Sequence, residues 1–206
     1  MCSAGGPPTE VMSMGELLFL NACIDRERSR TLRIARSAVS ASEDAGYHVT
    51  ELVLEEEYVR PMTTEVLRRR NVLLKAGEYD DQMFAYARRF RDADRIIVVA
   101  PFWDFGFPSV LKTYLESVSC LGITYRYTPE GELVGLCRAR RMTYITTRGG
   151  FVTDEDDLGF LTLRALGNYF GIPEVDCVGV NAMDIPTTDV EAVVSDISAK
   201  VRDIIL

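Results

Sequence analysis

Apolar residues recur along this chain in two alternating patterns, short continuous runs and longer segments with helical spacing. Continuous runs lie at 17–22, 96–100, 142–147 and 175–180, while 47–54 alternates apolar and polar residues. Short runs rich in β-branched residues are typical of strands buried on both faces, and alternation is typical of a strand nearer the sheet edge. We therefore predict five main strands.

The intervening segments predict helices at 32–45, 80–93, from Pro108 to Val118, 154–170 and 187–205. We expect the last helix to turn a set of apolar residues inward: Val190, Val193, Val194, Ile197, Val201 and Ile204. Residues 55–80 are charged and predict irregular structure or a short helix above the sheet. Their triple Arg68-Arg69-Arg70 is interpreted as a solvated face.

Residues 124–136 alternate around Pro129-Glu130-Gly131, which predicts a small inserted β-hairpin. Strands alternating with helices predict an α/β fold, a three-layer sandwich around a five-stranded parallel sheet. In the strand order 2-1-3-4-5, strands one, three and four are neighbours. We expect residues 16–206 to form one domain and residues 1–15, which hold two glycines and two prolines in succession, to be a flexible tail.

Charge and cysteine content narrow the class of protein. The formal net charge of −8 argues against a nucleic-acid or acidic-membrane partner, and no apolar run reaches the ~18 residues of a membrane span. The cysteines show no CxxC spacing, which favours reduced thiols in a cytoplasmic protein and no metal site: Cys2, Cys23, Cys120, Cys137 and Cys177. His48 is the only histidine, so Ser-His-Asp catalysis is not expected.

The loop after the first strand combines hydroxyl groups and positive charge at the start of a helix. Cys23 opens it, and Ser29, Arg30 and Thr31 close it. A loop that opens a helix offers free backbone N–H groups and the positive end of a dipole, which together bind phosphate. The alternative is that Ser29 only caps the helix and that the arginines are solvated.

Two further loops leave the carboxyl ends of predicted strands. Residues 101–108 concentrate aromatic rings between two prolines, and Arg148-Gly149-Gly150 lets the backbone approach a ligand closely. The aromatic loop is either the floor for a flat ligand or a hydrophobic turn beneath a neighbouring loop. In the predicted strand order the three loops meet at one crevice, which favours a phosphorylated planar cofactor.

The segments 100–116, 122–128 and 147–150 resemble the FMN-dependent NADH-azoreductase and NAD(P)H:quinone oxidoreductase family of flavodoxin-like proteins, and the resemblance extends from about Leu17 to Leu206. It implies a flavodoxin-like fold, FMN as cofactor, NADH or NADPH as electron donor, and a homodimer. It also implies ping-pong transfer of two electrons to a flat small-molecule acceptor such as a quinone or azo compound, with hydride carried by the flavin N5 and no catalytic side chain.

The resemblance further implies the residues that hold FMN: Cys23, Ser29, Arg30, Thr31, Pro101, Phe102, Trp103, Asp104, Phe105, Thr147, Arg148, Gly149 and Gly150. It implies that Trp103, Phe105 and Phe151 wall the acceptor pocket. Cys23 and Asp104 depart from the family pattern, which has a serine and an amide at these places. The alternatives are a flavodoxin-like electron carrier, an FMN reductase without a dedicated organic acceptor, and a cofactor-free hydrolytic or regulatory relative.

Overall fold

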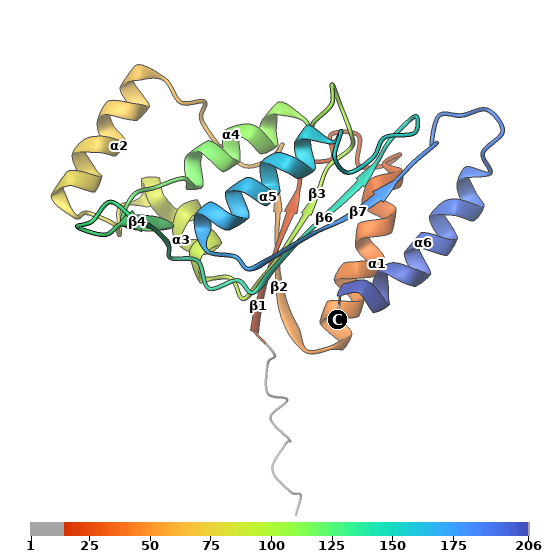
Figure 1. Cartoon of the computed structure of the whole chain (residues 1–206), viewed down its shortest axis with the longest axis horizontal. Helices are drawn as coiled ribbons and strands as arrows, with labels where there is room; N and C mark the ends of the chain where they lie inside the picture. The colour runs from red at the N-terminus through yellow and green to blue at the C-terminus, as the bar shows by residue number, and fades with distance from the viewer. Residues whose placement is uncertain (1–14, 206) are drawn as a thin grey trace, which may run out of the picture.

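Five parallel strands form the central sheet of the computed structural model, which describes residues 15–205 (Figure 1). The strands are β1 (Gly15–Asn21), β2 (Tyr47–Val53), β3 (Arg95–Val99), β6 (Arg141–Thr147) and β7 (Glu174–Val180), in the spatial order β2-β1-β3-β6-β7. Counting main strands only, this is the order 2-1-3-4-5. The predicted fold class and strand order are therefore confirmed.

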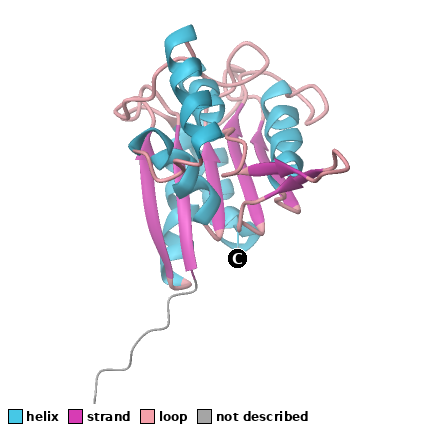
Figure 2. Ribbon diagram, turned by 90° about the vertical axis from the view of Figure 1, so that its left-hand side faces the viewer, coloured by secondary structure: helices cyan, strands magenta, loops and turns pink. Residues whose placement is uncertain are grey.

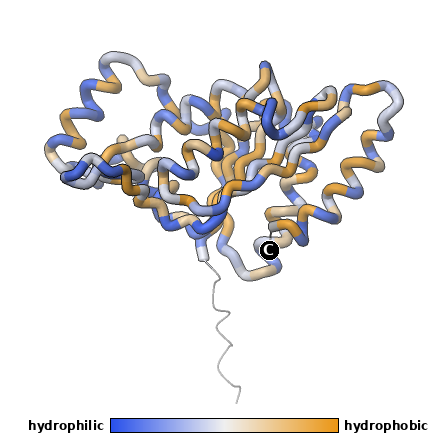
Figure 3. Tube along the Cα trace, viewed as in Figure 1, coloured by the Kyte–Doolittle hydropathy of each residue, from blue (hydrophilic) through white to orange (hydrophobic). Residues whose placement is uncertain are grey.

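Helices cover both faces of this sheet and make the three layers visible in Figure 2. On one face lie α1 (Arg30–Asp44) and α6 (Val190–Ile205). On the other face lie α3 (Ala85–Asp92), α4 (Ser109–Val118) and α5 (Leu158–Phe170). Side chains alternate across a strand, and in β1 Leu17 and Phe19 join the core beneath α1 while Leu18 and Leu20 join the core beneath α4 and α5. Figure 3 shows these central strands as predominantly apolar.

The predicted hairpin consists of β4 (Tyr125–Tyr127) and β5 (Leu133–Gly135), paired antiparallel. It lies against the carboxyl end of α5. A Cβ atom at Gly135 would come within 2.1 Å of the backbone nitrogen of Gly171, so only glycine permits this approach. The hairpin prediction is confirmed.

Residues 55–80 contain more regular structure than the charge pattern indicated. The helix α2 (Thr64–Ala76) is capped by the Thr63 hydroxyl, which accepts from the N–H of Val66, and ends at Gly77 in the left-handed conformation. None of its residues is buried, and it stands off the body of the molecule in Figure 1. Within the triple, Arg68 and Arg69 are exposed, but Arg70 is half-buried, so the solvated-face interpretation is wrong for Arg70.

Several boundaries differ from the predictions for local reasons. The helix expected from residue 154 begins at Leu158, because the Asp157 carboxylate accepts from the N–H of Phe160 and caps it. The segment 80–93 is a short 3₁₀ helix at Gln82–Phe84 followed by α3. Ile204 is 46% exposed rather than inward. Gly15, assigned to the tail, is the first residue of β1, and residues 1–14 lie outside the described residues.

Candidate functional site

Thr147 joins the three loops that the sequence placed at the carboxyl edge of the sheet. Its hydroxyl lies 2.6 Å from the hydroxyl of Thr31, at the start of α1. Its carbonyl accepts a hydrogen bond from the N–H of Phe102 at 3.2 Å, in the aromatic loop. The loops after β1, β3 and β6 are thus directly connected, as parallel neighbours with a common edge require.

The first turn of α1 presents free donors at this junction. Ser29 caps the helix, since its hydroxyl accepts from the N–H of Leu32 at 3.1 Å. The N–H groups of Arg30 and Thr31 have no acceptor among the residues that the structure describes. Ser29 therefore does cap the helix, as the alternative proposed. The free N–H groups and the positive end of the helix dipole are still available to bind an anion.

Arg30 is held by a loop that the sequence analysis did not include. Its guanidinium donates to the carbonyl of Met183 at 2.6 Å and to Asp184 Oδ1 at 3.0 Å. This loop directly follows β7. Ligands of such sheets bind beyond the carboxyl ends of the strands. The same rule that selected the other three loops could therefore have selected the loop after β7.

Cys23 lies in the core rather than on the open side of its loop. Its side chain is buried beneath α1, and burial raises the pKa of its thiol to about 11, with the Ser29 hydroxyl and Arg36 partly opposing the shift. The thiol is consequently neutral near pH 7. The backbone N–H of Cys23 is engaged by Asn21 Oδ1 at 3.1 Å, so this residue shapes the loop from inside.

The aromatic loop contains a tight two-residue turn. Trp103 and Gly106 exchange two backbone hydrogen bonds of 3.0 and 2.7 Å, and between them Asp104 and Phe105 have φ of +50° and +63°. Aspartate tolerates this left-handed conformation, whereas an aromatic residue there is strained. Asn and Asp are favoured at such left-handed turn positions, so the turn by itself explains an aspartate at position 104.

The turn holds aromatic rings out toward solvent. Trp103 is 50% exposed and Phe105 is 64% exposed, and the ring of Phe102 meets the ring of Phe105 edge-on at 6.2 Å. Phe151, after the glycine pair, is 81% exposed. The three residues predicted for the acceptor pocket thus present open apolar surface, and the alternative of a hydrophobic turn hidden beneath another loop does not hold.

The side chain of Arg148 points into the protein. It is 2% exposed and bonds Asp157 Oδ2 at 3.0 Å, Asp154 Oδ1 at 2.7 Å and the Val152 carbonyl at 3.0 Å. Burial alone would lower the pKa of Arg148, but the bonds to both aspartates outweigh it and raise that pKa. A Cβ atom at Gly179 would come within 2.5 Å of the guanidinium, so β7 leaves space for it. The Arg148 side chain therefore supports the loop from inside, and a contact between Arg148 and the cofactor stays a prediction.

The glycine pair after Arg148 is anchored through its carbonyl groups. Gly149 accepts from the N–H of Asp184 and Gly150 accepts from the N–H of Ala182, at 3.0 and 2.8 Å. The N–H groups of both glycines have no acceptor within the described part of the chain. A Cβ atom at Gly150 would meet no atom within 4 Å, so the space beside it is open. These donors are available to a ligand.

The comparison with protein families matches this architecture. The sequence model of a family described as having a flavodoxin-like fold matches residues 15–204 of this chain. The chain belongs to this flavodoxin-like family.

Relatives of this flavodoxin-like protein include named oxidoreductases. FMN-dependent NADH:quinone oxidoreductase 2 of Clostridium acetobutylicum is 29% identical and is aligned over 92% of this chain and 98% of its own length. An FMN-dependent NADH:quinone oxidoreductase of Clostridium perfringens is also 29% identical, over 89% of this chain and 94% of its own length.

Solved structures share the fold. An azoreductase from Bacillus anthracis superposes with a TM-score of 0.81 at 20% identity, covering 93% of this chain and 99% of the other. An FMN-dependent NADH-azoreductase from Bacillus anthracis in complex with FMN gives a TM-score of 0.80 at 20% identity, covering 93% and 98%. At this identity the likeness establishes the shared fold.

The described residues offer neither a metal site nor a membrane-spanning helix. Between residues 15 and 205, no three histidine, cysteine, aspartate or glutamate side chains gather closely enough to hold a metal ion. Within the same range, no helix combines the length and apolar character needed to cross a membrane.

Proposed function

We propose that this flavodoxin-like protein is an FMN-dependent NAD(P)H oxidoreductase that passes two electrons to a flat acceptor such as a quinone or an azo compound. The observation that carries the proposal is the junction at Thr147, which joins the start of α1, the aromatic loop and the glycine pair. The full-length relatives named as FMN-dependent NADH:quinone oxidoreductases support it.

The residues at the junction fit FMN. The free N–H groups of Arg30 and Thr31, with the hydroxyls of Ser29 and Thr31, form a cradle for its phosphate. The free N–H groups of Gly149 and Gly150 supply donors for the electron-rich edge of its ring, where they would stabilise negative charge. When bound, FMN supplies the hydride chemistry that no side chain here can perform.

The exposed rings fit a flat donor and a flat acceptor that use the same place in turn. Trp103, Phe105 and Phe151 offer apolar faces against which a nicotinamide, a quinone or an azo compound can stack. Since one such surface serves both, the oxidised nicotinamide leaves before the acceptor binds, which is a ping-pong order. Arg148 and Asp157 hold the glycine pair in place from inside.

A homodimer and a cytoplasmic location are part of the proposal. The exposed aromatic residues at 103, 105 and 151 form apolar surface of the kind that marks an interface. The free thiols of Cys23, Cys120, Cys137 and Cys177 suit a reducing compartment. Light scattering at micromolar concentration tests the first point. We expect a mass of about twice 23.1 kDa, and a monomeric mass would contradict it.

The purified protein tests the proposed activity directly. We expect a yellow protein whose released cofactor has the mass of FMN, and steady oxidation of NADH or NADPH only when a quinone is added. Release of FAD would contradict the cofactor. Reduction of the bound flavin without turnover in the presence of quinone would identify an electron carrier, and rapid turnover without any acceptor except free FMN would identify a flavin reductase.

Asp104→Asn is expected to raise the midpoint potential of bound FMN. Asp104 has no hydrogen-bond partner among the described residues, and α4 begins after Pro108 without a side-chain cap, so the carboxylate is not held as a cap. Its negative charge opposes negative charge on a reduced flavin nearby. Because Asp104 is exposed, the effect is about 1 kcal/mol, or roughly 20 mV for two electrons.

Asparagine also tolerates the left-handed turn, so the fold is retained. The measurement is a potential titration of both proteins at one pH. Glu130→Gln, which removes an exposed charge in the hairpin turn, serves as the control and should leave the potential unchanged. An unchanged potential in Asp104→Asn would remove the redox role and leave Asp104 as a turn residue.

A further inference from the structure

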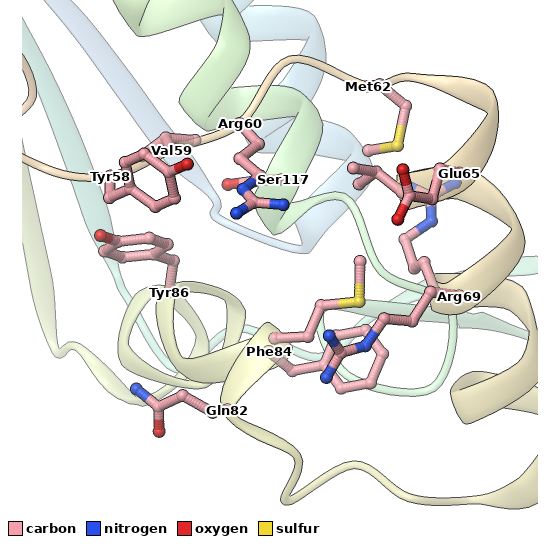
Figure 4. Close-up of a pocket in the computed structure, with 13 residues that line it drawn as sticks. Tyr58, Val59, Arg60, Met62, Glu65, Arg69, Gln82, Phe84, Tyr86 and Ser117 are labelled. Atoms are coloured by element: carbon pink, nitrogen blue, oxygen red, sulfur yellow. The ribbon is translucent and has the colours of Figure 1, made fainter.

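A cavity of about 340 Å³ lies against α2 (Figure 4). Its walls come from the segment that follows β2, from α2, from the 3₁₀ helix and α3, and from the end of α4. None of its lining residues belongs to the loops after β1, β3 or β6. The volume falls within the range of small-molecule sites.

Three arginines line this cavity in a chain whose net charge is −8. Arg69 pairs with Asp81 at 3.5 Å, and the guanidinium of Arg60 stacks over the ring of Tyr58 at 4.9 Å. Arg70 has neither an ion pair nor a hydrogen bond to any described residue, and its Nε atom is buried. A buried guanidinium N–H without an acceptor carries a desolvation cost that an anionic ligand would remove.

Aromatic and apolar groups make up much of the remaining wall. The rings of Tyr58 and Tyr86 lie at one end of the cavity, with Tyr58 itself 78% exposed, whereas Phe84 is 1% exposed and belongs to the core beneath it (Figure 4). The hydroxyl of Tyr86 is fixed by Glu57 at 2.6 Å, so its ring is held in place. Such walls favour a flat, unsaturated ligand body.

One carboxylate opposes these cations. Glu65 lines the cavity from α2, and Asp81, which pairs with Arg69, immediately precedes the 3₁₀ helix. Because Asp81 is paired with Arg69, the lining guanidinium groups without an ion pair to any described residue are those of Arg60 and Arg70, and they lie against the one lining carboxylate of Glu65. The unpaired Arg60 and Arg70 guanidinium groups, with the ring faces beside them, favour a ligand that carries both a negative group and an aromatic body.

We propose that this cavity binds a flat aromatic carboxylate, with the carboxylate on Arg70 and the ring against Tyr58 and Tyr86. The site is separate from the proposed FMN site and does not depend on the proposed function. Bidentate pairing of guanidinium with carboxylate supplies the directional contact, and the ring walls supply the apolar area.

The test titrates the purified full-length protein, whether or not it carries FMN, with 2-naphthoate in isothermal titration calorimetry. We expect saturable binding at one site per chain, with no change in the flavin absorption bands. Arg70→Gln should weaken binding by at least about 10-fold. Arg68→Gln removes the same charge from a neighbouring residue of α2 that does not line the cavity, and it should change affinity less than about 2-fold.

A second variant tests the proposal independently if Arg70→Gln fails to fold. Glu65→Gln removes the opposing charge and should tighten binding about 2- to 5-fold. The proposal is overturned if 2-naphthoate gives no saturable binding, if Arg68→Gln and Arg70→Gln weaken it equally, or if binding shifts the flavin bands, which would locate the probe at the cofactor. Equal binding of the neutral 2-naphthalenemethanol would also overturn it.

Discussion

Replacement of Asp157 by alanine is expected to lower the free energy of unfolding by about 3–5 kcal/mol. Asp157 is fully buried, and its Oδ2 atom bonds Nε of the 2%-exposed Arg148 at 3.0 Å. Removing one partner of a buried ion pair leaves the other charge without its main compensation. The same carboxylate caps α5 through the N–H of Phe160, so the substitution also frees a helix terminus.

Equilibrium unfolding in urea measures this loss. Asp154→Ala is the matched control, because Asp154 bonds the same guanidinium but its side chain is 48% exposed. Asp154→Ala should lower the free energy of unfolding by no more than about 1 kcal/mol. Asp157→Asn keeps a cap of the preferred type and should be intermediate. Equal effects of Asp157→Ala and Asp154→Ala would mean that Arg148 does not depend on its buried partner.

The second prediction concerns the affinity for FMN. The double variant Ser29→Ala, Thr31→Ala is expected to bind FMN about 100-fold more weakly, or worse. Each hydrogen bond to a charged phosphate contributes about 1.5–3 kcal/mol, so two lost hydroxyls correspond to at least that factor. Thr31 also bonds Thr147, so its loss loosens the connection between the first and third loops. Titration of the apoprotein with FMN, followed by flavin fluorescence, gives the affinity.

A control separates the loss of the helix cap from the loss of phosphate contacts. Thr63→Ala removes the same kind of cap from α2, where the hydroxyl accepts from the N–H of Val66. Both Ser29→Ala and Thr63→Ala should lower stability by about 1 kcal/mol, but only the former should weaken FMN binding. If the double variant bound FMN normally, the phosphate would have to lie elsewhere.

The parts of the fold that the sequence predicted correctly are those determined by local pattern. Runs such as 96–100 are long and β-branched enough to be strands, and the alternation around Pro129-Glu130-Gly131 is a hairpin signal on its own. A parallel sheet of five such strands then places all the loops at their carboxyl ends along one edge. That is why the loops of Ser29, Trp103 and Gly149 could be grouped from strand order and hydrophobic pattern alone.

Side-chain direction in loops was decided only by the tertiary structure. Arg148 stands beside two glycines in a candidate cofactor loop, yet it turns inward because Asp157, nine residues later, is buried within its reach. Arg70 belongs to a charged triple, yet its Nε atom is buried because the chain folds back beneath α2. A charged residue has no periodicity that reports its partner, so its direction depends on which distant segment packs against it.

The same distinction explains the boundaries and the contacts between loops. The start of α5 is set by the Asp157 cap, and Ile204 is exposed although its helical spacing groups it with the buried Val201. The hydroxyl contact between Thr31 and Thr147 joins residues 116 positions apart. Hydrophobic spacing determines which face of an element is buried, whereas contacts between polar side chains arise only after the elements have been packed together.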